Sequence, residues 1–355
     1  MLETAKDLLQ PLPLPDPRLL AFSNGVLNLD THQFSCHDPS NFISEAMPVK
    51  YDPDAKCDLF LKMFLANVLK PADVDLLQRY LSQLLQGINH SQAILILNGD
   101  AGWGKSSLMK IIGSLLGWRK VGIIRPQLFE DEFELAHYSN KHLLYFPDMP
   151  TSFLDCPEAS IFKNLVGGDP LWADVRGNRL VVQGQFPVVL SCNGLPKIHL
   201  DQDSEAWNRR LVVLSLKAPD HNKHFGKMAD LLLSEASGIL NWLLEGRAKL
   251  LKDKLQLVLN DEQRTRTEKL LLASDSPSMF VKSCLVKKDG DLGVMELFTY
   301  YQAWCSRNIV PPISSKAFTR IARAQIEFQF GLRFRHDVGE EASNRGWKGV
   351  GIAQT

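Results

Sequence analysis

The chain has 355 residues, long enough for about two to three domains, and 45% of them are hydrophobic and 23% charged. This is the composition of an ordinary soluble globular protein, and the 40 basic side chains balance the 40 acidic ones, so total charge does not indicate a polyanionic partner. No apolar run approaches the roughly 18 residues of a membrane span and the start, MLETAKDLLQ, lacks a secretory pattern, so we expect a cytoplasmic protein with no membrane partner.

The six cysteines are scattered without a CxxC pair, which fits reduced thiols better than a disulfide framework.

The first 90 residues predict a small strand region followed by a helical collar. After the proline-rich LPLPDP at 12–17, the segment FSNGVLNLDTHQF combines an Asn-Gly turn with alternating apolar residues, which is typical of short strands. From 58 to 85 the apolar spacing is helical and is broken at Pro71.

The segment ILILNGDAGWGKSSLMKII, residues 94–112, runs from an apolar strand pattern through a glycine-rich turn into a helical pattern. Two glycines, a lysine and a hydroxyl at this spacing form a phosphate-loop pattern, in which backbone N–H groups surround a polyphosphate. Lys105, on a surface loop, would reach the β- and γ-phosphates, and Ser106 would bind Mg²⁺ at the helix N-terminus. The sequence therefore predicts ATP and Mg²⁺ as cofactors, with these nucleotide-binding residues: Gly99, Asp100, Ala101, Gly102, Trp103, Gly104, Lys105, Ser106 and Ser107.

Trp103 lies inside this turn, and two positions for it stay open. It either packs over the turn or contacts a neighbouring subunit.

Residues 91–220 alternate apolar runs with helical stretches, which predicts a mostly parallel α/β sheet. The strand runs are AILILNG, KHLLYF, FPVVLSCN and RRLVVLSL.

Asp148 follows the second run and is the predicted magnesium acid and catalytic residue, with a turn-capping role as the alternative. Its neighbour is Pro147 where many ATPases carry a second carboxylate, so the catalytic base stays open among Asp155, Glu158 and Asp169.

Asn193 follows the third run and would orient the γ-phosphate and the attacking water, although an Asn-Gly turn explains it as well. Arg209 and Arg210 precede the fourth run. One of them could stabilise the γ-phosphate charge of a neighbouring subunit, the alternative being a surface ion pair with Asp203 or Glu205.

Between Asp148 and Asn193, the segment KNLVGGDPLWADVRGNRLVVQGQFPVVLSCN resembles the superfamily 3 helicases, which are AAA+ replicative helicases of DNA viruses, phages and plasmids. Lys163 and Gly167-Gly168-Asp169 fall on the motif between the acid and the asparagine, as in the helicase modules of phage and poxvirus-type primase–helicases. The resemblance covers residues 99 to about 215, and more weakly the segments around 20–52 and 235–242.

The resemblance implies an AAA+ P-loop ATPase core and a homohexameric ring around one DNA strand, translocating 3′ to 5′ in the host cytoplasm. A hairpin with its tip at 176–179 would grip single-stranded DNA at a fork through Lys163, Arg176, Asn178 and Arg179. A solvated turn is the alternative for the two arginines.

Residues 221–275 predict a helical lid or linker, and residues 276–355 a winged-helix-like domain. The latter holds 11 lysines and arginines against 7 aspartates and glutamates. Its third predicted helix places Lys316, Arg320 and Arg323 on one face, with Arg345 and Lys348 in the wing. This face would bind DNA or dock a primase or polymerase partner, unless it is only a solvated surface.

We therefore expect an ATP-dependent DNA helicase. The alternative is a DNA-binding initiator or loader that uses ATP as an assembly switch, and a P-loop phosphotransferase acting on a small molecule is a third hypothesis.

Overall fold

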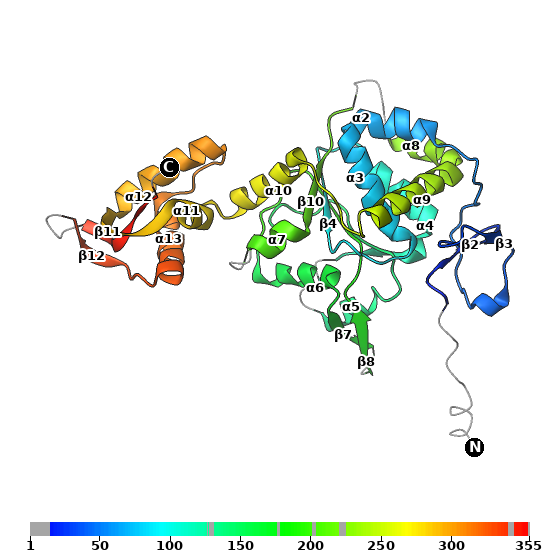
Figure 1. Ribbon diagram of the computed structural model, residues 1–355, viewed down its shortest axis with the longest axis horizontal. Helices are drawn as coiled ribbons and strands as arrows, with labels where there is room; N and C mark the ends of the chain where they lie inside the picture. The colour runs from blue at the N-terminus through cyan, green and yellow to red at the C-terminus, as the bar shows by residue number, and fades with distance from the viewer. Residues whose placement is uncertain are drawn as a thin grey trace, which may run out of the picture. The chain divides into compact units, whose positions relative to one another are not determined.

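The computed structural model describes residues 15–125, 127, 131–175, 178–200, 204–219, 225–339 and 344–353; the side chains of 132, 175, 178–180 and 225–227 are not described. The chain divides into two compact units (Figure 1). Unit 1 contains residues 1–151, 160–195 and 209–264, and unit 2 contains residues 152–159, 196–208 and 265–355. Each unit is described by itself.

Unit 1 is built around a five-stranded sheet in which all neighbouring strands are parallel, with the spatial order β10-β4-β9-β6-β5. The strands are β4 (Ile94–Asn98), β5 (Val121–Ile123), β6 (Leu143–Phe146), β9 (Val188–Cys192) and β10 (Leu211–Ser215). The four strands expected from apolar runs are confirmed, and so is the α/β class. The sequence did not indicate β5, which has only three residues.

Helices cover one face of this sheet. Alternate strand residues such as Leu95, Val189 and Val212 share one core with helices that precede the sheet in the sequence and helices that follow it. Figure 1 shows α3, α4 and α9 gathered there. The helices of this layer are α2 (Ala66–Val68), α3 (Pro71–Ser82), α4 (Lys105–Leu116), α8 (Phe225–Leu232) and α9 (Ala236–Lys252), with a π-helical turn at Leu59–Leu65 before α2.

The opposite strand residues, including Ile96, Leu144 and Leu190, are also buried, so the sheet is covered on both faces, as expected for a parallel sheet. Beside the sheet lie α5 (Glu132–Ala136), α6 (Ile161–Gly167) and an antiparallel hairpin of β7 (Pro170–Val175) and β8 (Asn178–Gln183).

The N-terminal strands form a small antiparallel sheet of β1 (Leu19–Phe22), β2 (Gly25–Asn28) and β3 (Phe34–Ser35). Leu20, Phe22 and Leu27 belong to the same core as the helices on the parallel sheet. The Asn24 side chain pairs with both backbone groups of Tyr51, at 2.9 Å each, and so ties the hairpin turn to the next segment.

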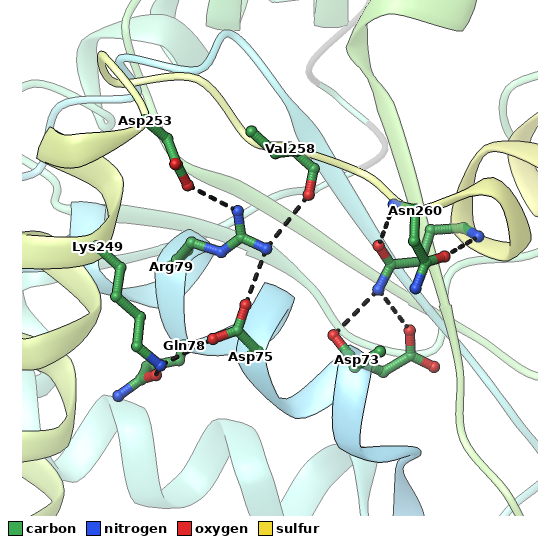
Figure 2. A network of polar contacts seen from close by, with 10 residues as sticks. Asp73, Asp75, Gln78, Arg79, Lys249, Asp253, Val258 and Asn260 are labelled. Atoms are coloured by element: carbon green, nitrogen blue, oxygen red, sulfur yellow. Dashed lines mark hydrogen bonds and ion pairs between the residues drawn. The ribbon is translucent and has the colours of Figure 1, made fainter.

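A polar cluster joins α3 to the segment after α9 (Figure 2). The nearly buried Arg79 guanidinium forms ion pairs with Asp75 at 2.9 Å and Asp253 at 3.0 Å, and donates to the Val258 carbonyl at 3.2 Å. Lys249 also binds Asp75, at 2.8 Å. We call Asp75, Arg79, Lys249 and Asp253 the α3 clasp.

A capping box follows the clasp. Asn260 and Gln263 each bond the other's backbone N–H, at 2.9 and 3.0 Å, at the start of α10 (Asp261–Ser274). The buried Gln263 amide also donates to Asp73, at 3.0 Å. The first turn of α10 is therefore fixed to α3.

Unit 2 contains α11 (Ser276–Cys284), β11 (Leu285–Gly293), α12 (Val294–Asn308), α13 (Ser315–Phe330), β12 (Arg335–Val338) and β13 (Asn344–Ile352). Its strands form an antiparallel sheet with the order β11-β13-β12, and its core includes Phe280, Tyr301, Phe318 and Trp347. These elements include three helices and, at the end, the strands β12 and β13, while the winged-helix-like arrangement expected for residues 276–355 stays a prediction. The strand β11 was not expected, and it begins where α11 ends, because the chain turns after Cys284 to pair with β13.

The helix α7 (Ser204–Arg210) runs in sequence from unit 2 into unit 1, and α10 runs from unit 1 into unit 2. Among the described residues, no helix is both long and apolar enough to cross a membrane. The predicted division at residues 90, 220 and 275 stays a prediction.

Candidate functional site

Three polar loops meet at the carboxyl edge of the parallel sheet, where ligands bind in open α/β sheets. Gly99 follows β4, Asp148 follows β6, and Asn193 follows β9. Hydrogen bonds join each loop to a neighbouring strand. The Gly99 N–H donates to Cys192 O at 3.3 Å, and the Gly194 N–H donates to Asn98 Oδ1 at 3.0 Å. The Met149 N–H donates to Ser191 O at 2.7 Å. The parallel pairing thus brings together three positions spread over almost a hundred residues of sequence.

The Gly99–Ser106 turn needs glycine at two positions. Gly102 and Gly104 have φ values of 84° and 98°, in the left-handed region that favours glycine. A Cβ at Gly102 would have no heavy atom within 4 Å, so the turn is open on that side. Gly104 is also the N-cap of α4 and has no side chain to bond the free N–H groups of its first turn.

Trp103 supports the turn from the protein side. Its half-buried ring packs against the core of unit 1, and a Cβ on Gly99 would lie 2.9 Å from it. The sequence left two placements open for Trp103, over the turn or against a neighbouring subunit, and in the structure its ring packs within the chain. Asp100, Ala101 and Gly102 are exposed.

Lys105 is buried, with 4% of its surface exposed, and this corrects the expectation of a surface loop. Its Nζ donates to the carbonyl of Gly99, to the carbonyl of Asp100 at 3.0 Å and to Asn193 Oδ1 at 2.7 Å. Burial lowers the pKa of Lys105, and the nearby Asp148 carboxylate acts in the opposite direction. The ammonium is thus held at the turn by three oxygen atoms.

Ser106 and Asp148 are exposed, and Ser107 is half-buried, at the same edge. Asp148 has a left-handed backbone with φ 47°, which aspartate tolerates better than most residues. A hydroxyl and a carboxylate are hard oxygen ligands of the kind Mg²⁺ takes together with phosphate and water. Within the described part of the chain, no group of three or more His, Cys, Asp or Glu side chains could hold a metal by itself.

Arg209 and Arg210 lie at the amino ends of the strands, which is the amino edge of the sheet, opposite the carboxyl edge where the three loops meet. They directly precede β10, whose five residues run parallel to β4, so about 16 Å of strand separates them from the carboxyl edge. The half-buried Arg210 has its Nη2 beside Gly167, where the Asp169 carboxylate also approaches. Within one chain, neither arginine nor Asp169 reaches Lys105.

The β7–β8 hairpin begins beside this amino edge. The Gly168 N–H donates to Gly184 O at 2.7 Å, and a Cβ on Gly184 would lie 2.0 Å from Asn164 O, so α6 and the hairpin base approach closely. Lys163 on α6 is half-buried. Arg176 lies outside the described residues, while Asn178 and Arg179 are placed in β8 without description of their side chains.

Sequence reasoning missed Trp172 on this hairpin, which is 63% exposed. The alternation of β7 could have revealed it, since Trp172 stands between two apolar residues that face the core.

Unit 2 contains a large hollow of about 1180 Å³. Lys316, Arg320 and Arg323 are exposed along one of its sides, on the face of α13 opposite the buried Phe318 and Ile326. Arg345 and His336 also line it, and the Arg323 guanidinium lies 5.1 Å from the centre of the Phe334 ring. Lys348 instead lies near Asp291 and Asp337, at 4.0 and 3.9 Å.

The molecule is thus an α/β protein with a glycine-rich turn, a buried lysine, an acid and an asparagine at one edge of a parallel sheet. Residues 1–70 match the family described as "D5 N terminal like", and residues 97–210 match a family of unknown function, DUF5906.

A protein of Invertebrate iridescent virus 6 named "Putative helicase 184R" is 25% identical over 215 residues, which are 55% of this chain and 22% of that protein. The chain thus spans about a fifth of the length of this relative.

Among solved structures, the apo NrS-1 C-terminal region is similar with a TM-score of 0.51 and 14% identity, covering 85% of this chain and 78% of that one. A second form of that region aligns with a TM-score of 0.48 and 14% identity, covering 80% and 65% of the two chains. The matches to the family described as "D5 N terminal like" and to a viral protein named as a putative helicase agree with the resemblance stated from the sequence.

Proposed function

We propose that this chain is an ATP-dependent DNA helicase module that hydrolyses ATP between subunits of a ring. The observation that carries the proposal is the junction of Lys105 and Asn193, whose side chains meet at 2.7 Å beside the glycine-rich turn. A γ-phosphate here would offer Lys105 anionic oxygens in place of a neutral amide, and would release Asn193 to orient the attacking water.

The remaining parts of the edge fit a nucleotide with Mg²⁺. The open side of the turn at Gly102 leaves room for a polyphosphate, and the first turn of α4 directs N–H groups toward an anion. Ser106 and Asp148 would hold the metal ion, which would neutralise charge on the phosphates.

The position of Arg209 and Arg210 supports a ring. Because they lie at the opposite edge from Lys105, they cannot assist hydrolysis in their own chain, but a neighbouring copy could present them to this site. Homohexamer formation is the corresponding proposal. DNA would be held by the β7–β8 hairpin and by the cationic side of the hollow in unit 2.

A second function, an initiator or loader switched by ATP, is favoured by one feature. The residue before Asp148 is Pro147, so the acid that follows β6 has no adjacent carboxylate to activate water. Slow hydrolysis would suit a switch better than a motor.

Strand displacement separates the two functions. Purified protein with ATP and Mg²⁺ is mixed with a forked duplex carrying a dye and a quencher. A helicase separates the strands at a rate that depends on ATP concentration, whereas a switch binds the fork and leaves it paired. The Lys105→Met variant is the control for strand separation that does not need ATP.

A further inference from the structure

Two neighbouring strands of the parallel sheet lead into an Asn-Gly pair at the carboxyl edge. Asn98 is the last residue of β4 and lies opposite Cys192, the last residue of β9, in the parallel register. The pairs Asn98-Gly99 and Asn193-Gly194 therefore leave adjacent strands one residue apart in register. The first pair opens the glycine-rich turn, and the second contains the asparagine of the candidate site.

The Asn98 side chain joins these two loops. Its Oδ1 accepts the Gly194 N–H at 3.0 Å, and Gly194 has a φ of 143°, in a region that favours glycine. The backbone of Asn98 is fixed on both sides, because it pairs with Cys192 in β9 and with Ser215 in β10. An acceptor oxygen that extends from an interior strand of the sheet therefore holds the loop at Gly194.

This bond closes a circuit of contacts around the candidate site. Lys105 Nζ donates to the carbonyl of Gly99, the neighbour of Asn98, and to Asn193 Oδ1 at 2.7 Å. Asn193 is in turn the neighbour of Gly194, whose N–H donates back to Asn98. In the proposed function, Lys105 exchanges its contact with Asn193 for the γ-phosphate. The bond from Asn98 then remains to hold the Asn193 loop.

We infer that Asn98 is a positioning residue, which keeps the Asn193 side chain directed toward the γ-phosphate once Lys105 contacts the nucleotide. This inference rests on the proposed function, because it adds a residue to the same site. Asn98 acts through Gly194 and does not need to touch ATP. A displacement of about 1 Å at a reacting centre can cost on the order of 100-fold in rate, so a bond to the residue next to Asn193 is enough to control turnover.

The Asn98→Leu variant tests this role in steady-state ATP turnover with Mg²⁺ and single-stranded DNA. Leucine is similar in size but has no acceptor oxygen, so kcat should fall by about tenfold. Binding of a fluorescent, non-hydrolysable ATP analogue should stay within about threefold of wild type, because Asn98 does not hold the phosphates. Ser215→Ala, at the end of the neighbouring strand β10, is the matched control and should keep the wild-type kcat.

A double-mutant cycle shows whether Asn98 acts through Asn193. Asn193→Ala alone should lower kcat, and adding Asn98→Leu should lower it no further, because no carboxamide is left to position. A residue that only supports the fold would reduce kcat by the same factor in both backgrounds. If circular dichroism shows that Asn98→Leu does not fold, Asn98→Ser gives the same cycle, since its shorter side chain ends before the Gly194 N–H.

Three outcomes overturn the inference and leave the proposed function standing. Wild-type kcat in Asn98→Leu would show that its bond to Gly194 does not matter for turnover. Equal factors in the two backgrounds would show that Asn98 does not act through Asn193. Full activity of Asn193→Ala would leave Asn98 nothing to position. If the wild-type protein hydrolyses no ATP, the proposed function itself fails, and the inference fails with it.

Discussion

At the scale of single residues, Lys105 connects the fold to the proposed ATP chemistry. Its ammonium is buried and satisfied by three oxygen acceptors, one of them from Asn193. A buried lysine costs desolvation, which is reflected in its lowered pKa, so the turn is built to keep one charge at this position.

Lys105→Met should reduce ATP turnover by about 100-fold or more, because one charged donor to the transferred phosphate is lost. It should also lower stability by about 1–3 kcal/mol, since it leaves acceptors unpaired at the turn. Phosphate release and thermal melting measure the two effects. Lys110→Met, on the exposed side of the same helix, should change neither by much. Unchanged turnover in Lys105→Met would exclude the proposed phosphate contact.

His142 predicts a pH dependence of stability. Burial lowers its pKa to about 4 from the ordinary 6.5, and Nδ1 lies 3.0 Å from the Leu84 carbonyl, as expected for a neutral ring donating a hydrogen bond. The imidazole of the unfolded chain binds a proton at higher pH than that of the folded chain. The free energy of unfolding is therefore unaffected by His142 above about pH 6.5 and falls as the pH drops toward 4, by up to roughly 3 kcal/mol. The free energy of unfolding, measured with urea across this pH range, should depend less steeply on pH in His142→Gln than in the wild-type protein. Equal slopes in the two proteins would contradict the assignment.

At the scale of elements, the α3 clasp fixes the segment between α9 and α10. Arg79 binds Asp253 and the Val258 carbonyl, and the capping box of α10 is bonded to α3 through Asp73 (Figure 2). A buried guanidinium with several partners contributes mainly by fixing one arrangement, because its desolvation offsets much of its attraction.

Arg79→Met should therefore loosen residues 253–260 while the parallel sheet stays folded. Hydrogen exchange followed by mass spectrometry should show faster exchange in that segment and unchanged protection of β4 and β9. Arg264→Met is the control, because that arginine pairs with Asp261 at the surface. Equal protection of 253–260 in Arg79→Met and wild type would show that the clasp is not what holds the segment.

The sequence was informative where local patterns decide structure. The apolar runs before Gly99, Asp148 and Asn193 predicted strand ends at one edge, and the parallel sheet follows from their alternation with helices. The strand β11 was missed because LVKKDGDLG is mostly charged and exposed, and it exists through its pairing with β13. The clasp was missed because Arg79 and Asp253 are far apart in sequence, and only tertiary packing brings them together.

At the scale of the whole molecule, the residues proposed for ATP hydrolysis lie at opposite ends of the strands of the sheet. Lys105 and Asn193 lie at one edge, and Arg209 and Arg210 at the other. If a neighbouring copy supplies the arginine, an inactive chain lacking it can be complemented by one lacking the lysine.

A mixture of Arg210→Ala and Lys105→Met should recover part of the ATP turnover that each variant lacks, because some interfaces then hold an intact lysine and an intact arginine. A mixture of Lys105→Met and Asn193→Ala is the matched control and should stay inactive, since both residues belong to one chain's site. Repeating the experiment with Arg209→Ala in place of Arg210→Ala shows which of the two arginines acts on the γ-phosphate of the neighbouring subunit. Full activity of both arginine variants on their own would refute a trans arginine.

The most direct test of the central claim is ATP turnover with and without single-stranded DNA, followed together with mass in solution. A ring-forming DNA helicase should show strong stimulation of ATP turnover by the strand in an assembly of ring size. An unstimulated monomer that turns over ATP at the same rate with and without DNA would contradict it.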